Sequence, residues 1–270
     1  MRSLPSCETL ALRCDDWCLH ITFNRPEVKN ALNTRMWEEL SAVFAAIDED
    51  RSIRAVVLRG ASGTFCAGGD MKERATIAAP QAGVDDPMLA RNRMGGRILT
   101  QIDRAPQVVI AIVEGAAMGG GFGMVCVADV ALALADARMA MPEVTLGIVP
   151  AQISPFITRR IGHSQARRLA LTAGALDGRQ AAAIGLVHEA YADTAALDAA
   201  LAAMLQRLAR CAPGALAATK KLIALTGTVP LEDHLDIAAS SFVAALRGPE
   251  GVEGAASFKE KRKPEWGRAA

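Results

Sequence analysis

Apolar positions along the first 150 residues follow two periods, which predict an alternation of strands and helices. Residues 10–14 and 17–24 are short apolar runs around the Asp15–Asp16 turn, and they predict two strands. From residue 34 the apolar positions recur at helical spacing, so a helix capped by Asn33 or Thr34 should bury one face. The positions expected on that face are Met36, Leu40, Val43, Phe44 and Ile47.

Two strongly apolar runs, RAVVL (54–58) and QVVIAIV (107–113), are each followed by a glycine-rich turn. Runs of β-branched residues that end at glycine are typical of buried strands. The two turns read TFCAGGD (64–70) and GAAMGGGFG (115–123). A further strand is expected at 129–134 and a helix at 87–102. The segment 78–87, which contains Pro, Gly and paired Asp, is expected to be a mobile surface loop of the kind that covers ligands.

Beyond residue 154 the pattern is almost wholly helical. Alanine-rich segments near 164–173, 177–184, 195–210, 214–225 and 231–246 predict helices, and Pro213 and Pro230 are placed to start the last two. Strands that alternate with helices, followed by helices alone, indicate an α/β core with a helical appendage. We place the core at residues 1–195 and the appendage, which we expect to form an oligomer contact, at residues 196–270.

The chain has 270 residues, of which 30 are basic and 29 acidic, and its formal net charge is +1. This balance lacks the basic surplus of a nucleic-acid or anionic-membrane binder, so we expect a small-molecule partner. The longest uncharged apolar stretch, residues 115–128, is shorter than the ~20 residues that a membrane span needs. No apolar export segment follows Arg2, so the expected compartment is the cytoplasm.

The six cysteines contain no CxxC pair, and we expect them to be free thiols. Their spacing also offers no metal site. Cys66 lies beside glycines, but no histidine is close to it in the sequence, so we interpret it as a packed thiol rather than a nucleophile. The four histidines are scattered along the chain, and none is assigned a role.

The two glycine-rich turns permit a specific chemistry. Where Cβ atoms are missing, an oxygen atom can approach main-chain N–H groups, and a helix N-terminus adds the positive end of a dipole. Two such turns in one domain could direct two N–H donors at one carbonyl oxygen as it gains charge. The alternative is that the glycines serve tight packing of helix against sheet. Neither turn fits the GxGxxG dinucleotide fingerprint or the GxxxxGK[ST] phosphate loop.

A single carboxylate, Glu143, lies in the apolar segment RMAMPEVTLGIVP. Pro142 stiffens the approach to it, and Gly147 permits a tight turn after it. A carboxyl group buried among apolar residues has its pKa raised toward the range that is useful for proton transfer. Glu143 is therefore the candidate acid and base.

Five segments together resemble the enoyl-CoA hydratase/isomerase (crotonase) superfamily over nearly the whole chain: FNRPEVKNALN, FCAGGDMKE, EGAAMGGGFG, MPEVTLGIVP and FKEKRKPEW. The resemblance implies the crotonase (ClpP-like) α/β fold, in which ββα units form a superhelix and C-terminal helices build a trimer, often paired into a hexamer. It also implies an acyl-CoA thioester as the ligand, with coenzyme A entering as part of the substrate and no other cofactor.

By position in these motifs, the resemblance assigns the oxyanion donors to the N–H groups of Gly69 and Gly120 and the acid and base to Glu143. It places further residues along the substrate and its coenzyme A: Lys29, Ala67, Gly68, Asp70, Met71, Lys72, Gly119 and Gly123. Phe258 and Lys261 resemble residues that reach the coenzyme A phosphates of a neighbouring subunit. The alternative for the KEKRK run is a solvated tail.

One position departs from the family's hydratases, which commonly hold a second glutamate where this chain has Gly123. A single glutamate at the position of Glu143 is also typical of Δ3-Δ2-enoyl-CoA isomerases, so isomerisation is the alternative activity. A binding protein that has lost its chemistry is a third hypothesis, which the intact Glu143 and the near-neutral charge disfavour.

A closer resemblance, carried by MGGGFG, VPAQISPF with RRIG, and GVEGAASFKEKRKPEW, is to the hydratases of isohexenylglutaconyl-CoA and 3-methylglutaconyl-CoA in acyclic terpene and leucine breakdown. Such substrates are branched and carry a carboxylate of their own. We hypothesise that Gly123 makes room for the branch and removes a carboxylate that would repel the substrate's. The substrate carboxylate needs a cation, and the candidates are Arg91, Arg93 and Arg97.

Overall fold

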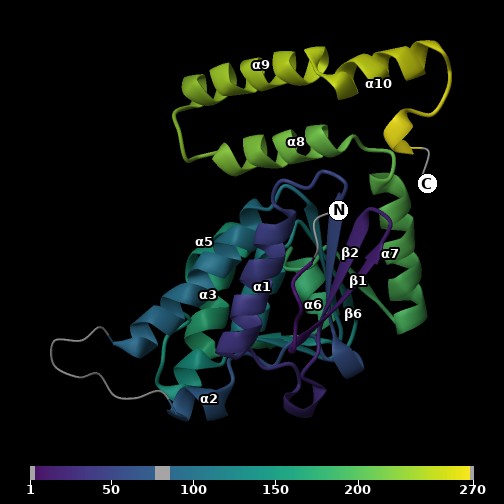
Figure 1. The fold of residues 1–270 in the computed structure, drawn as a ribbon. Helices are drawn as coiled ribbons and strands as arrows, with labels where there is room; N and C mark the ends of the chain where they lie inside the picture. The colour runs from purple at the N-terminus through teal and green to yellow at the C-terminus, as the bar shows by residue number, and fades with distance from the viewer. Residues whose placement is uncertain (1–3, 77–85, 268–270) are drawn as a thin grey trace.

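Six strands form the central sheet of the protein, in a computed structural model that describes residues 4–76 and 86–267 (Figure 1). They lie in the order β1 (Leu10–Asp15), β2 (Cys18–Phe23), β3 (Ala55–Gly60), β4 (Val108–Val113), β6 (Val130–Leu134) and β9 (Glu189–Tyr191). β1 pairs antiparallel with β2, and each later pair is parallel. Parallel strands are covered on both faces, which explains their nearly continuous apolar sequences.

Side chains of the central strands alternate between two cores. On one face, Val56 and Leu58 join a large cluster that includes residues of α1 (Thr34–Ile47), α3 (Pro87–Arg104), α4 (Gly120–Val127) and α5 (Ser154–Thr172). On the other face, Val57 packs with Leu197 and Leu201 of α7 (Thr194–Leu208). The predicted buried face of α1 is confirmed, because its five expected positions are at most 2% exposed. Asn33 is its cap and accepts the Met36 N–H at 2.9 Å.

A second sheet consists of three very short strands, β5 (Ala116–Met118), β7 (Arg138–Ala140) and β8 (Ala175–Leu176). β5 pairs parallel with β7, and β7 pairs antiparallel with β8. β5 also forms a parallel bridge from Ala117 to Cys66, which belongs to the glycine-rich turn after β3. The second sheet therefore lies against that turn.

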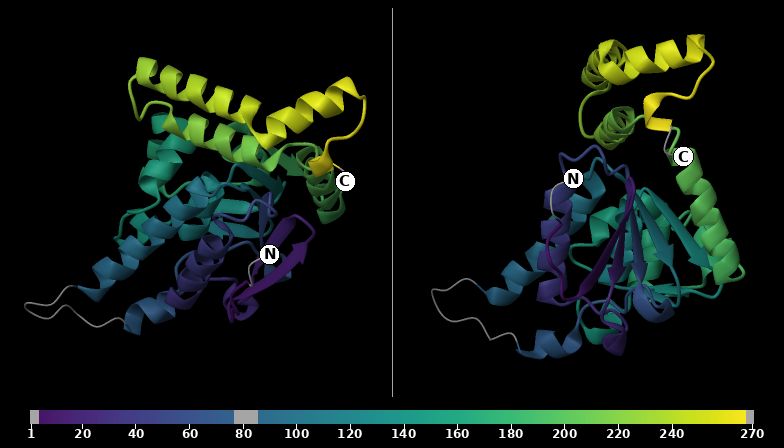
Figure 2. Two further views of the ribbon diagram at one scale, coloured as in Figure 1. Left: turned by 45° about the horizontal axis from the view of Figure 1, so that its top comes forward. Right: turned by 45° about the vertical axis from the view of Figure 1, so that its right-hand side comes forward.

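The last three long helices form an arm outside the layers of the core (Figures 1 and 2). They are α8 (Pro213–Leu225), α9 (Leu231–Arg247) and α10 (Pro249–Lys259). α9 packs on α8, and α10 packs on α9. Lys220 of α8 holds the arm to the core through an ion pair with Asp129 (2.6 Å) and a hydrogen bond to the Gln107 carbonyl (3.0 Å). A cavity of about 880 Å³ lies between α8 and the core.

The helical half differs from the prediction in three places. α5 begins at Ser154 rather than near residue 164, and its path changes at Gly162, where φ is 74°. α7 packs on the sheet although we expected it in the appendage, so the chain leaves the core near Pro213 rather than at residue 196. α10 was not predicted, whereas α6 (Gly178–Ala183) lies where a helix was expected.

Most of the expected surface loop at 78–87 lies outside the described residues. At its described end, Asp86 caps α3 by accepting the Met88 N–H at 2.8 Å. In residues 4–76 and 86–267, none of the helices combines the length and the apolar character that crossing a membrane requires.

Candidate active site

The two glycine-rich turns lie side by side in a defined register. The Cys66 N–H donates to the Ala116 carbonyl (2.8 Å), and the Met118 N–H donates to the Cys66 carbonyl (2.9 Å). These bonds make the parallel bridge between Cys66 and Ala117, and Gly69 and Gly120 each lie three residues beyond it. Because neighbouring strands are about 4.8 Å apart, the register brings the two glycines to the same level of the fold.

The N–H groups of Gly69 and Gly120 have no acceptor within the described part of the chain. On one side of Gly69, the Leu32 N–H binds the Gly68 carbonyl (2.7 Å), and the Leu32 carbonyl accepts the Asp70 N–H (2.9 Å). This parallel pattern turns the Gly69 N–H away from Leu32. Gly120 is the first residue of α4, where N–H groups lack an intrahelical partner. Two unpaired donors therefore lie at the ends of adjacent segments.

The glycines of the two turns are explained by different constraints. Gly68 has a φ of 95° and Gly119 a φ of 48°, values that favour glycine. A Cβ on Gly121 would lie 2.8 Å from the Cβ of Cys66, so close packing requires glycine there. A Cβ on Gly69, by contrast, would meet no atom within 4 Å. Burial raises the pKa of the Cys66 thiol to about 12, as is typical of a packed thiol rather than a nucleophile.

Glu143 begins a short 3₁₀ helix (η3, Glu143–Leu146) after β7, and its carboxylate lies beside Gly119. Its Oε1 would be 2.7 Å from a Cβ on Gly119. Its Oε2 is buried and has no hydrogen-bond partner among the residues that the structure describes. Burial raises the pKa of Glu143 above its ordinary value, and a hydrogen bond from its own N–H only partly opposes this. The carboxyl group therefore lies beside Gly119, which directly precedes the unpaired N–H group of Gly120.

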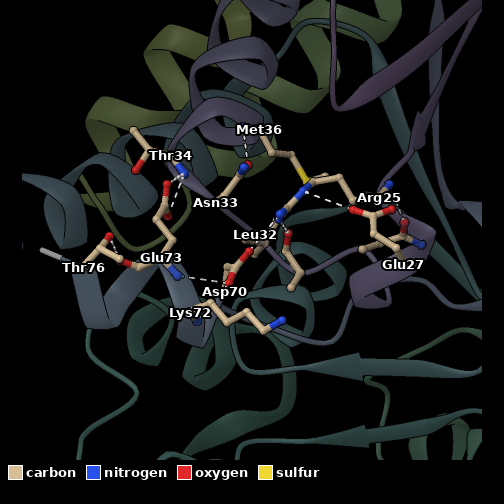
Figure 3. A network of polar contacts seen from close by, with 12 residues as sticks. Arg25, Glu27, Leu32, Asn33, Thr34, Met36, Asp70, Lys72, Glu73 and Thr76 are labelled. Carbon is tan, nitrogen blue, oxygen red and sulfur yellow. Dashed lines mark hydrogen bonds and ion pairs between the residues drawn. The ribbon is translucent and has the colours of Figure 1, made fainter.

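Arg25 ties the segment that contains Gly69 to the neighbouring segment at Ala31 (Figure 3). Its guanidinium donates to the Ala31 carbonyl (2.6 Å) and forms an ion pair with Asp70 (2.9 Å). Asp70 also accepts two N–H groups at the start of α2 (Met71–Thr76), at 3.0 and 3.2 Å. Burial raises the pKa of Asp70, but Arg25 and these N–H groups outweigh burial and hold the pKa below its usual range. The backbone of Gly69 is thus held on both sides.

Glu73 of α2 makes a second set of charged contacts in the same network (Figure 3). It accepts the Thr34 N–H at 2.9 Å and forms an ion pair with Arg91 of α3 at 2.6 Å. Burial raises the pKa of Glu73, but the Thr34 N–H and Arg91 together hold it below its usual range. Arg91 also donates to the Leu32 carbonyl (3.3 Å), so its guanidinium is already occupied by contacts within the protein.

Gly123 faces apolar side chains rather than open space. A Cβ on it would lie 2.4 Å from Cγ2 of Ile153 and 3.4 Å from Cδ1 of Leu99, both of which are buried. The space that we expected to receive a substrate branch is filled by Ile153 in this structure. A branch could enter it only if Ile153 moved. The place expected for a second glutamate is consequently apolar.

Four of the residues expected along the coenzyme A lie together near Asp70. The Ala67 N–H donates to the Lys29 carbonyl (3.0 Å), and Met71 and Lys72 start α2 directly after Asp70. Lys29, Met71 and Lys72 are exposed, as a contact with a bound ligand would require. Phe258 and Lys261 are far from this group, because they lie at the end of α10 in the arm (Figure 1).

Sequence reasoning missed Arg25, Trp37 and Ile153 as residues that shape the site. Trp37 is 6% exposed, and its Cζ2 would lie 3.8 Å from a Cβ on Gly120. Arg25 was present in one of the quoted motifs, but its partner Asp70 is 45 residues away. No periodicity or local spacing connects residues so far apart.

Residues 16–269 match the enoyl-CoA hydratase/isomerase family. The chain belongs to this family. The matched region runs from the residue directly after β1 to the end of the arm. The protein is accordingly an enzyme of the enoyl-CoA hydratase type, a hydro-lyase.

Solved structures and curated relatives agree with the family. The structure of Pseudomonas aeruginosa AtuE is 50% identical, with a TM-score of 0.93, and the match covers 97% of this chain and 100% of that one. An enoyl-CoA hydratase/isomerase from Marinobacter aquaeolei is 48% identical, with a TM-score of 0.94 and the same coverage. The mitochondrial methylglutaconyl-CoA hydratase of Mus musculus is 32% identical over 249 residues, 90% of this chain and 77% of that protein. The predicted crotonase fold is confirmed.

Removal of either partner of the Arg25–Asp70 pair should destabilise the protein. Their side chains are 17% and 9% exposed, and an unpaired charge left behind in a buried pair is strongly unfavourable. Arg25→Gln and Asp70→Asn should each lower the free energy of unfolding by about 2 to 3 kcal/mol, and the double variant should lose less than their sum. Urea unfolding at pH 7 measures these changes.

The control is the Arg13–Asp15 pair, whose side chains are 63% and 48% exposed. Arg13→Gln should change the free energy of unfolding by less than about 1 kcal/mol.

Because the pKa of Asp70 is lowered, the contribution of Asp70 to stability is present above the ordinary Asp pKa and is lost as the pH falls through the lowered value. Additive effects of the Arg25 and Asp70 variants would contradict the pairing.

Glu143→Gln should make the protein more stable at neutral pH. The raised pKa means that the folded protein binds the proton of Glu143 more tightly than the unfolded chain does. Ionisation above that pKa therefore destabilises the fold, and a neutral amide of the same size avoids this cost. The gain in unfolding free energy over the wild type should grow with pH from the ordinary carboxyl range upward and then level off. An equal gain in unfolding free energy at pH 4 and pH 8 would contradict the raised pKa of Glu143.

Proposed function

We propose that the protein adds water across the 2,3 double bond of an enoyl-CoA thioester. The observation that carries the proposal is the half-buried carboxylate of Glu143, whose Oε2 has no partner among the described residues. It lies beside Gly119, next to the unpaired N–H group of Gly120, and the N–H group of Gly69 lies at the same level of the register. In this proposal Glu143 is the acid and base, and the two N–H groups bind the thioester oxygen. Membership of the enoyl-CoA hydratase/isomerase family supports the same reaction.

The proposed reaction begins when the Glu143 carboxylate removes a proton from water and the water oxygen bonds to the β-carbon. The electron pair of the double bond moves toward the thioester, whose oxygen becomes an enolate oxygen. Two N–H donors stabilise that charge, and one such donor typically contributes about 3 kcal/mol to the transition state. Protonated Glu143 then returns the proton to the α-carbon. The carboxylate is restored, and one water molecule has been added.

The substrate class that we propose is a branched glutaconyl-CoA, such as isohexenylglutaconyl-CoA or 3-methylglutaconyl-CoA. One support is the similarity to a protein named methylglutaconyl-CoA hydratase. The other support is that position 123 is a glycine packed against Ile153. Glu143 therefore has no second acidic side chain from this position. A second carboxylate there would raise the cost of binding a substrate that carries its own negative charge.

We also propose that coenzyme A lies along the surface formed by Lys29, Ala67 and Lys72, above the buried Gly68. The exposed lysines can contact its charged groups, and the backbone at Ala67 and Gly68 can face its adenine. Coenzyme A enters as part of the substrate, and the proposed reaction needs no other cofactor. The cytoplasm is the compartment that we propose for it.

The arm supports the proposal of a homotrimer, alone or paired into a hexamer. α9 has no buried residue in the single chain and exposes an apolar stripe. Its members Leu231, Leu235, Phe242 and Leu246 are 51% to 69% exposed and recur at helical spacing. Stripes of this kind mark interaction sites. In the assembly, Phe258 and Lys261 of one copy would reach the coenzyme A of another.

Phe242→Asp should weaken this assembly, because a carboxylate cannot be buried cheaply in an apolar contact. Light scattering after size exclusion should show a multiple of the 28.4 kDa chain for the wild type and a shift toward one chain for the variant. Ser240→Asp adds the same charge away from the stripe and should not change the mass. A monomeric wild type would contradict the proposal.

Glu143→Gln should lower kcat for hydration about 100- to 10,000-fold, the usual contribution of an acid and base. Loss of the absorbance of the conjugated enoyl thioester measures hydration of crotonyl-, 3-methylglutaconyl- and isohexenylglutaconyl-CoA. Glu38→Gln, at an exposed position of α1, is the matched control.

The same assay separates the alternative activities. A wild type that instead creates the conjugated signal from a 3-enoyl-CoA, and leaves 2-enoyl-CoA intact, would be an isomerase. Full activity of Glu143→Gln would contradict the assignment of the acid and base. A wild type without either activity would favour a binding protein.

A further inference from the structure

Three arginines of α3 were candidates for binding a substrate carboxylate, and one of them is already neutralised. Arg91 forms its ion pair with Glu73 at 2.6 Å. Arg93 and Arg97 are exposed, and no carboxylate of the described residues lies within ion-pair distance of either. The structure therefore leaves two of the three candidate arginines without a carboxylate partner among the described residues.

Arg93 points toward Gln152, which directly precedes Ile153. Nη1 of Arg93 lies 3.3 Å from Oε1 of Gln152, and Nε2 of Gln152 donates to Oδ1 of Asn92 at 3.0 Å. The amide of Gln152 is thus held by two consecutive residues of α3. The contact uses one of the five N–H donors of the guanidinium and leaves the others for a ligand.

Two consecutive glycines allow this group to lie close to the α3 backbone. A Cβ on Gly96 would be 2.1 Å from Oε1 of Gln152 and 2.9 Å from Nη1 of Arg93. A Cβ on Gly95 would be 3.6 Å from Cζ2 of Trp37. Both glycines are buried within the helix, where only proline is a poorer helix former. The close approach of Gln152 and Trp37 accounts for their presence.

Two short routes of contact lead from this cluster to the proposed catalytic groups. One runs from Gly95 through Trp37 to Gly120. Cζ2 of Trp37 would lie 3.8 Å from a Cβ on Gly120. The other runs from Gln152 to its neighbour Ile153, whose Cγ2 occupies the space that a Cβ on Gly123 would need. The Arg93 cluster is therefore linked by packing contacts to the helix start that carries Gly120 and Gly123.

We propose that Arg93, oriented by Gln152, binds the remote carboxylate of a glutaconyl thioester; this inference rests on the proposed function. The planar guanidinium matches the two oxygens of a carboxylate in a bidentate contact, which an ammonium group cannot reproduce. Because Arg93 is exposed, the carboxylate keeps part of its hydration and avoids the cost of a fully buried charge. Arg93 is thus a specificity-determining residue that does not touch the reacting atoms.

The test compares two thioesters that share a carbon skeleton except for the carboxyl group, 3-methylglutaconyl-CoA and 3-methylcrotonyl-CoA. Arg93→Gln should lower the ratio of their kcat/KM values about 10- to 100-fold, the range for loss of a hydrogen-bonded charge contact. The loss should fall mainly on KM, because the contact is made equally in the ground state and the transition state. Arg93→Lys should recover only part of the ratio.

Two further variants keep the test specific. Arg104→Gln removes the same charge from the other end of α3, and it should leave the ratio unchanged. Arg97→Gln tests the rival cation. The inference would be overturned if Arg93→Gln left the ratio of the two kcat/KM values unchanged, or if Arg97→Gln lowered that ratio more. Hydration by the wild type would still support the proposed function. If the wild type hydrates neither thioester, both the proposed function and the inference about Arg93 are overturned. If it hydrates the two thioesters equally well, only the contact with the carboxylate is overturned.

Discussion

The site depends on the register that the chain between β3 and α2 adopts between its two neighbours. The bridge from Cys66 to Ala117 sets it on one side, and the bridge from Leu32 to Gly69 sets it on the other. A single oxygen atom can be held by two main-chain donors only when two distant segments present them at the same level. The register meets that condition for Gly69 and Gly120, and it uses backbone bonds alone. The ion pairs of Asp70 with Arg25 and of Glu73 with Arg91 then hold the segments on which this register lies.

Much of this frame is visible in the sequence, but its contacts are not. The β-branched runs predicted β3 and β4, and the glycine clusters after them marked both turns correctly. β5, β7 and β8 escaped prediction because strands of two or three residues have no period and form only where a neighbour pairs with them. The contact of Gly123 with Ile153 and the Arg25–Asp70 pair were equally hidden, since each joins segments that come together only in the folded chain. Periodicity reports burial, and it does not report which partner a buried residue meets.

The charges near the site are divided into two groups with different roles. Asp70 and Glu73 are paired with Arg25 and Arg91, and their pKa values are lowered, so they remain ionised and hold the frame. Glu143 is half-buried, its buried Oε2 has no hydrogen-bond partner among the described residues, and burial raises its pKa. Groups whose environments shift their pKa values in opposite directions can serve different functions at one pH. The paired carboxylates therefore titrate at lower pH than Glu143 does.

This division also explains why a destabilising arrangement can persist at the centre of the fold. The unpartnered Oε2 of Glu143 and two glycines inside α3 both act against stability. They are tolerated because the surrounding backbone is held on each side, by bridges to Leu32 and Ala117 and by a sheet buried on both faces. If Glu143 had a permanent partner, its pKa would fall and the proton would no longer be exchangeable. The same lack of a partner that weakens the fold at this point makes the carboxylate available to a substrate.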